Sequence, residues 1–143
     1  MSPSSPAIER EHRMIESQTK PLPKSPVEVV NTQWEQGERN VKRLARSELL
    51  SVLLHHWDTG GEVGLHHHTD GDATWVVVEG EVTFHGEGDE ILARAGRSEA
   101  VLVPRNTMYW FENSGTQPLV MYRISAKVGG ISEKDDRVYH NRD

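Results

Sequence analysis

The stretch that decides the fold is Gly64–Val82, GLHHHTDGDATWVVVEGEV, in which three histidines precede an acidic turn and a run of β-branched and aromatic residues. Successive side chains of a β-strand point to opposite faces, so His66 and His68 share one face and His67 takes the other. The rise of a strand places the Cα atoms of His66 and His68 about 6.6 Å apart. Two imidazoles at this spacing can bind one metal ion, with bonds of roughly 2.0–2.1 Å.

The same pattern also fits a strand that binds no metal. Val63 and Leu65 share their face with His67. If hydrophobic alternation alone decided which face is buried, His66 and His68 would point to solvent. The local pattern therefore leaves two interpretations open, a metal site and an exposed polar strand.

The composition excludes several classes of protein. The chain has 143 residues and a formal net charge of −6, which fits one domain and argues against nucleic acid as a partner. It contains no cysteine, so disulfides, thiolate zinc sites and a cysteine nucleophile are excluded. No apolar run is long enough to span a bilayer, and residues 1–26 lack the apolar stretch of a signal peptide. We expect a soluble, cytoplasmic protein that binds neither nucleic acid nor membranes.

Short β-rich runs separated by turn sequences such as DTGG, TDGD, GEGD and NSGTQP fill the middle of the chain. About eight such runs without a convincing internal helix predict an all-β fold, a small antiparallel β-barrel. The expected barrel covers residues 27–130, between a flexible Pro/Ser-rich tail (1–26) and a polar C-terminal tail (131–143). The expected strands are Ser47–Trp57, Val63–His68, Thr74–Val78, Glu81–His85, Glu90–Ala93, Ala100–Val103, Met108–Glu112 and Leu119–Ser125, with a further candidate near Val27–Asn31.

Two groups of residues resemble the sequence motifs of the cupin superfamily. Within Gly60–Gly80, a glycine, five residues, His66-x-His68 and a closing glycine follow the first cupin motif. The second motif, Pro-x-Gly-x2-His-x3-Asn, aligns with PRNTMYWFEN at Pro104, Asn106, Tyr109 and Asn113. The resemblance covers residues from about 40 to 126. It implies a cupin barrel, a double-stranded β-helix or jelly roll, whose two motifs face each other across a pocket.

The resemblance also implies a metal site, because cupins usually bind one divalent metal through three histidines and a glutamate. His66 and His68 would then point inward as ligands. Two standard ligands are missing, since Ala73 stands at the glutamate position and Tyr109 at the third histidine. A turn or bulge that brings Asp72 inward would complete a set of two histidines and one carboxylate. Fe(II) is the favoured ion for that set, with Mn, Ni, Cu and Zn as alternatives.

Three functions remain open on this basis. The first is a metal-dependent oxidoreductase of the dioxygenase type that acts on a small organic molecule, because the two-histidine, one-carboxylate set is used by non-haem Fe(II) oxygenases. The second is a metal-dependent lyase, isomerase or cyclase in which Tyr109 moves protons. The third is a barrel that binds a small molecule without catalysis. Tyr109 is the candidate catalytic residue in the first two.

Substrate-binding residues follow from strand alternation. If Ala73 faces the pocket, Trp75 and Val77 face it too, and Phe111 shares the face of Tyr109. Trp75, Val77 and Phe111 would form an apolar wall for a small ligand. Arg123 is a candidate for holding a carboxylate substrate. Exposed strand edges and the resemblance to small cupins predict a homodimer.

Overall fold

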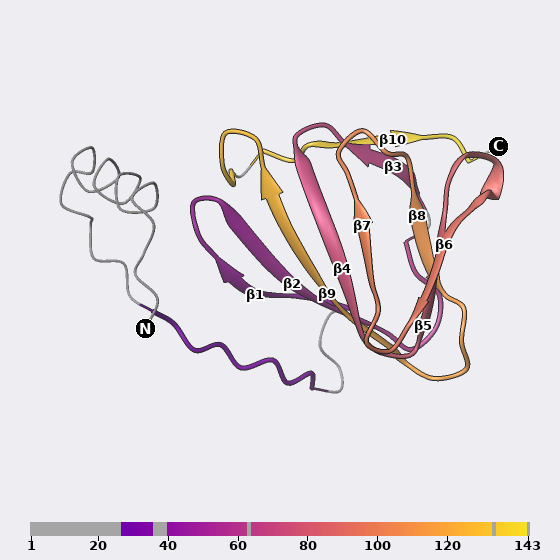
Figure 1. Ribbon diagram of the computed structural model, residues 1–143, viewed down its shortest axis with the longest axis horizontal. Coiled ribbons are helices and arrows are strands. Elements are labelled where there is room, and N and C mark those ends of the chain that lie inside the picture. Colours follow the sequence, from indigo (N-terminus) through magenta and orange to yellow (C-terminus); the bar gives the residue numbers. More distant parts are fainter. Residues whose placement is uncertain (1–26, 36–39, 63, 133, 143) are drawn as a thin grey trace, which may run out of the picture.

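The computed structural model describes residues 27–35, 40–62, 64–132 and 134–142 (Figure 1). These residues form ten β-strands and one 3-10 turn, η1 (Glu87–Asp89), and they contain no α-helix. The strands are β1 (Val41–Arg46), β2 (Leu50–Trp57), β3 (Leu65–His68), β4 (Gly71–Glu79), β5 (Glu81–His85), β6 (Ile91–Gly96), β7 (Ala100–Val103), β8 (Trp110–Asn113), β9 (Leu119–Lys127) and β10 (Arg137–His140).

The strands form three antiparallel sheets. The largest has the order β1-β2-β9-β4-β7, the second has the order β6-β5-β8, and the third pairs β10 with β3. Figure 1 shows the large sheet on one side, the β6-β5-β8 sheet on the other, and β3 with β10 along one end. The described strands therefore form a jelly roll, although their hydrogen bonds do not close into one continuous barrel as the sequence predicts. An isolated bridge between His66 and Tyr109 links β3 to the chain just before β8.

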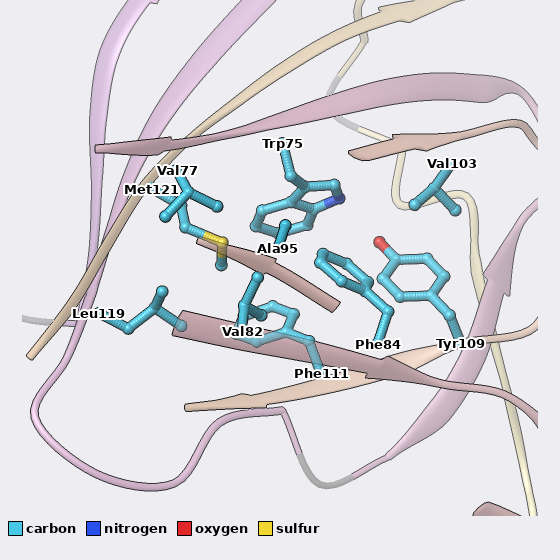
Figure 2. Close-up of a cluster of buried hydrophobic side chains, with 10 residues drawn as sticks. All are labelled: Trp75, Val77, Val82, Phe84, Ala95, Val103, Tyr109, Phe111, Leu119 and Met121. Atoms are coloured by element: carbon cyan, nitrogen blue, oxygen red, sulfur yellow. The ribbon is translucent and has the colours of Figure 1, made fainter. Parts of the chain in front are cut away.

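The hydrophobic core lies between the two larger sheets. Strand alternation explains which residues enter it, because Ala73, Trp75 and Val77 of β4 are buried while the side chains between them are more exposed. Figure 2 shows side chains from both sheets converging on one another. The core cluster consists of Trp75, Val77, Val82, Phe84, Ala95, Val103, Tyr109, Phe111, Leu119 and Met121.

Two turns of the cupin-like motifs need a left-handed backbone. Gly80, between β4 and β5, has φ +86°, and a Cβ atom there would lie 2.5 Å from the carbonyl oxygen of Pro118. Only glycine fits this position without moving the neighbouring chain. Asn106 stands at the glycine of the second motif and has φ +66°, a conformation that asparagine tolerates better than most residues. Its N–H donates to the carbonyl oxygen of His68 at 2.7 Å, which connects the two motifs.

The observed strands agree with most of the expected ones and add two. β5 and β7 have the expected bounds, whereas the sequence does not predict β1 or β10, and the candidate near Val27–Asn31 is not a strand. The C-terminal segment, predicted as a polar tail, pairs with β3 through β10 and is part of the fold. The predicted N-terminal tail, residues 1–26, lies outside the described residues. In the described part of the chain, no helix could cross a membrane.

The location of the core predicts different effects for two leucine substitutions of identical chemistry. Leu119 is 0% exposed in the core, whereas Leu102 on β7 is 68% exposed. Leu119→Ala is expected to lower the free energy of unfolding by about 2–5 kcal/mol, because it leaves a cavity in a packed interior. Leu102→Ala is expected to change it by no more than about 0.5 kcal/mol. Urea unfolding followed by tryptophan fluorescence measures both, and equal effects would contradict the described core.

Candidate active site

A cavity of about 750 Å³ opens beside the core, between the large sheet and β3. Its floor is formed by Trp75 and Tyr109, which also belong to the core cluster. Leu53, His55 and Trp57 of β2 and Arg123, Ser125 and Lys127 of β9 form one wall, because alternate residues of a strand share a face. His66 and His68 of β3, Glu62 before it, Val41 and Arg43 of β1 and residues of the C-terminal segment also line the cavity.

His66 presents an unprotonated nitrogen to the cavity. Its Nδ1 donates to the carbonyl oxygen of Gly64 at 2.8 Å, so Nε2 holds the lone pair of the neutral ring. Nε2 is buried without a hydrogen-bond partner and lies 3.7 Å from Oε2 of Glu62. Burial lowers the pKa of His66 to about 4, outweighing the hydrogen bond to Gly64. The ring is therefore a neutral proton acceptor at neutral pH.

Glu62 has a largely buried carboxyl, with its side chain 20% exposed, that titrates near neutrality. Burial raises the pKa of Glu62 to about 7, and the positive charges of Arg123 and Arg137 only partly oppose that rise. Its Oε1 is buried and has no hydrogen-bond partner. A group of this kind exchanges protons at physiological pH, which is a property of general acids and bases.

His68 is paired with a carboxylate from the C-terminal segment. Its Nδ1 donates to Oδ1 of Asp136 at 2.8 Å, and its Nε2 lies 3.5 Å from Nη2 of Arg123. Burial lowers the pKa of His68, although the hydrogen bond to Asp136 acts in the opposite direction. Burial also opposes ionisation of Asp136, but its hydrogen bonds from His68 and from the N–H of Asp70 hold the pKa of that carboxyl below its usual range.

Tyr109 retains its proton. It is 1% exposed, and its ring centroid lies 4.6 Å from that of His66. Burial, and secondarily the negative charge of Glu62, raises the pKa of the phenol well above its usual value. Tyr109 is therefore suited to donate a hydrogen bond or a proton and poorly suited to bind a metal as phenolate.

Arg123 supplies positive charge at the centre of the cavity wall. It lies on β9 opposite Trp75 of β4, and its guanidinium is 5.6 Å from the Trp75 ring centroid. It also donates to Oγ of Ser125 at 3.2 Å. Five cationic side chains line the cavity, against three acidic ones, whereas the chain as a whole carries a net charge of −6. The cavity is thus locally basic in an acidic protein.

The structure brings together five of the residues singled out from the sequence, Arg123 among them, and separates three. His66, His68, Tyr109 and Trp75 all line the cavity. Asp72, the expected carboxylate ligand, is exposed on the outer face, where its Oδ1 accepts from the N–H of Arg105 at 2.8 Å. Val77 and Phe111, expected in the pocket wall, lie in the hydrophobic core behind Trp75 and do not line the cavity.

Two acidic residues of the site are absent from the sequence prediction. Glu62 belongs to the loop before β3, where no strand periodicity indicates which way a side chain points. Asp136 belongs to the C-terminal segment, where the polar sequence gives no strand signal. A sequence clue existed only for Glu62, which lies four residues before His66 and is the acidic residue nearest to it on that side.

The described residues do not fit the divalent metal centre that the sequence predicts. His66 Nε2 and Glu62 Oε1 have no hydrogen-bond partners and are available as metal ligands. The third possible ligand atom, His68 Nε2, lies 3.5 Å from Nη2 of Arg123. The positive charge of the guanidinium would repel a metal ion there. In the described ranges, no group of three or more histidine, aspartate and glutamate side chains is arranged to hold an ion. Metal binding stays a prediction, and we derive no chemical step from it.

The sequence and the fold place the chain in a known family. Residues 53–125, slightly more than half of the chain, match the sequence model of the cupin domain. The chain therefore belongs to the cupin family, as its two motifs predict. No curated protein sequence matches it significantly.

Solved structures share the fold at low sequence identity. An uncharacterised double-stranded β-helix protein from Klebsiella pneumoniae has a TM-score of 0.60 and 18% identity, over 76% of this chain and 90% of that one. An RmlC-like cupin from Methanocaldococcus jannaschii has a TM-score of 0.61 and 17% identity, over 74% and 95%. The Streptomyces protein PAC13, solved with uridine, has a TM-score of 0.56 and 17% identity, over 73% and 82%. These likenesses establish the double-stranded β-helix fold.

The burial of Glu62 predicts that its carboxyl titrates about 2 to 3 pH units above an ordinary glutamate, near pH 7. The folded protein then holds a proton that the unfolded chain has released, so the free energy of unfolding falls as pH rises from about 4.5 to 7. Carbon-13 NMR of labelled glutamate carboxyls measures the titration, and Glu62→Gln identifies the resonance.

The effect of Glu62 on stability has to be separated from that of His66, and a comparison of variants does this. His66, whose pKa is lowered, contributes in the opposite direction, since stability is lost as pH falls from about 6.5 to 4. Only the comparison of wild type with Glu62→Gln isolates the carboxyl. Glu79→Gln, at an exposed position of β4, controls for the loss of one negative charge. If every glutamate titrated below pH 5, the buried-carboxyl site would be wrong.

The position of Arg123 predicts that this side chain weakens metal binding. Arg123→Gln removes a positive charge 3.5 Å from His68 Nε2, so we expect its affinity for Zn²⁺ to rise at least about tenfold over wild type. Competition with a colorimetric chelator measures the affinity in protein purified without a His-tag. Adding His66→Ala and His68→Ala to Arg123→Gln should abolish the gain. Stoichiometric metal in the wild type that this pair of substitutions removes would instead establish the predicted centre.

Proposed function

We propose that this cupin is an enzyme that binds a small organic anion in the cavity and catalyses proton transfer on it, as a lyase or isomerase does. The observation that carries the proposal is Glu62, a carboxyl with a pKa of about 7 in the wall of a basic cavity. It lies 3.7 Å from the unpartnered Nε2 of His66. Catalytic acids and bases need pKa values near the working pH, and burial is how proteins achieve this for a carboxyl.

The charge of the cavity supports an anionic substrate. Arg123 extends its guanidinium between Trp75 and His68, and its planar fork matches the geometry of a carboxylate. Lys127 and Arg137 add positive charge nearer the rim. A basic cavity in an acidic chain concentrates anions locally and repels cations.

The remaining polar groups have complementary roles in proton transfer. Glu62 removes or returns a proton, and His66 Nε2 is a second acceptor beside it. Tyr109, which stays protonated, donates to an oxygen on which negative charge develops. Arg123 holds the substrate carboxylate and stabilises the same charge. This division gives an acid, a base and an anion anchor around one space, which proton abstraction next to a carbonyl requires.

The sequence also predicts two other functions, a metal-dependent dioxygenase and a non-catalytic binding protein, and the geometry of the cavity favours both less. The dioxygenase interpretation needs a redox metal held by three donors, and the described residues fit that arrangement less well than they fit acid–base chemistry. Binding without catalysis would use the same basic cavity. A carboxyl with a pKa of about 7 and one buried oxygen without a partner is costly for a pure binder, because a fully hydrogen-bonded or apolar residue would be more stable there.

Deuterium exchange tests the proposed proton transfer. Pyruvate, 2-oxobutyrate and phenylpyruvate carry a carboxylate for Arg123 and an acidic C–H next to a carbonyl. In D2O, proton NMR is expected to show loss of that C–H signal from at least one of them, faster than the uncatalysed background. Glu62→Gln should slow the exchange by about 100-fold or more, as expected for loss of a general base. Arg123→Gln should mainly raise KM, because it removes the anchor.

A binding experiment separates an enzyme from a pure binder. Benzoate and benzamide differ in charge but not in ring, so wild type is expected to bind benzoate more tightly and Arg123→Gln to lose that preference. The indole resonance of Trp75 reports binding in the cavity. Equal binding of both compounds would contradict the anionic substrate. Selective benzoate binding without any exchange of the 2-oxo acids, in wild type and Glu62→Gln alike, would favour the binder.

A further inference from the structure

The C-terminal strap, defined as residues 134–142, runs along β3 at the rim of the cavity (Figure 1). Its strand β10 pairs antiparallel with β3, with Tyr139 opposite His66 and Arg137 opposite His68. Near its end, the Arg142 guanidinium lies 3.7 Å from the Trp110 ring centroid and donates to Asp89 at 3.2 Å. The strap thus spans from the cavity to η1 on the far side of β3.

At the cavity, one buried carboxylate adds to the attachment that the β10–β3 pairing provides. Asp136 is the only buried residue of the strap, whereas Val138 and Tyr139 are 41% and 61% exposed. Its Oδ2 accepts from the N–H of Gly71 at 2.9 Å and from that of Asp70 at 3.0 Å. Apolar burial therefore contributes little to holding the strap. Polar contacts hold it instead: the pairing of β10 with β3, the contacts of Arg142 and the hydrogen bonds of Asp136.

The second oxygen of Asp136 faces the active site. Its Oδ1 accepts from His68 Nδ1 at 2.8 Å and lies 3.5 Å from Lys127 Nζ. Because a carboxylate can only accept, it holds the proton of the neutral His68 ring on Nδ1 and leaves the lone pair on Nε2. That lone pair points at Arg123. The opposite tautomer would place an N–H against the guanidinium, donor against donor.

We propose that Asp136 is a positioning residue, through which the strap fixes the tautomer and orientation of His68 and, through His68, the direction of Arg123 in the cavity. A role of Asp136 in catalysis rests on the proposed function. Its effect on the tautomer of His68 does not depend on that function. Asp136 thereby makes the strap part of the site. Tyr139, whose ring centroid lies 5.7 Å from that of His66, covers the same rim.

The isosteric substitution Asp136→Asn is expected to change the tautomer of His68. In Asp136→Asn, the amide oxygen must face the two backbone N–H groups of Asp70 and Gly71, because an NH2 group there would meet two donors. The NH2 group is then directed at His68 Nδ1 and can donate only to a lone pair. We expect His68 to change to the Nε2-protonated tautomer. Asp135→Asn is the matched control, since Asp135 is exposed and pairs with Arg137.

The experiment is nitrogen-15 NMR of histidine-labelled full-length protein, in which the two tautomers give different ring patterns. Wild type and Asp135→Asn are expected to show His68 protonated on Nδ1, and Asp136→Asn to show it protonated on Nε2. Amide hydrogen exchange in β10 should be at least about tenfold faster in Asp136→Asn, because one end of the strap is less firmly held. An unchanged tautomer, or equal exchange in both variants, would overturn the proposal.

The wild-type nitrogen-15 spectrum and the proton exchange of the 2-oxo acids cover the cases in which the variants alone do not decide. If Asp136→Asn does not fold, the wild-type spectrum decides by itself, since His68 protonated on Nε2 would contradict the geometry. Proton exchange of the 2-oxo acids separates this proposal from the proposed function. A changed tautomer with no exchange activity in any variant would support the positioning role and reject the proposed reaction. A changed tautomer with reduced kcat and little change in KM would support both.

Discussion

The interior of the protein is organised by the aromatic floor formed by Trp75 and Tyr109. Each ring is 1% exposed and packs in the apolar core (Figure 2). Each also lines the cavity. Burial of an aromatic side chain of this size removes about 150–250 Å² from water and stabilises the fold by roughly 4–6 kcal/mol. The floor thus closes the core and also provides the low-dielectric surface on which the polar groups of the site rest.

That surface explains the protonation states of the site. Burial raises the pKa of Glu62 to about 7 and lowers that of His66 to about 4. Both groups are therefore neutral between about pH 4 and pH 7, whereas Arg123 and Asp136 carry full charges at the centre of the site. The guanidinium is compensated by aromatic contact and neighbouring acceptors, and the carboxylate by His68 and two backbone N–H groups. A charge that lacked such partners would be too costly to bury.

Much of the fold could be predicted because its signals are local. β5 and β7 are bounded by turn residues and rich in β-formers, and the sequence predicts their ends correctly. β1 and β10 mix apolar with basic side chains and give no clear strand signal, and their pairing with β2 and β3 makes them strands. The local rule of strand alternation also gives the position of Asp72, which points away from the face of Ala73. Its predicted role required a bulge, whereas regular alternation in β4 turns it outward.

The sequence by itself determined the class of the fold, the cupin motifs and the shared face of His66 and His68, because period-two alternation and turn chemistry are properties of adjacent residues. Only the tertiary structure decided which groups meet that face. Glu62 comes from a loop, Arg123 from the middle of β9, and Asp136 from a strap near the end of the chain. These contacts depend on strand pairing between distant segments, and so do the desolvation and charge that set the chemistry of the site.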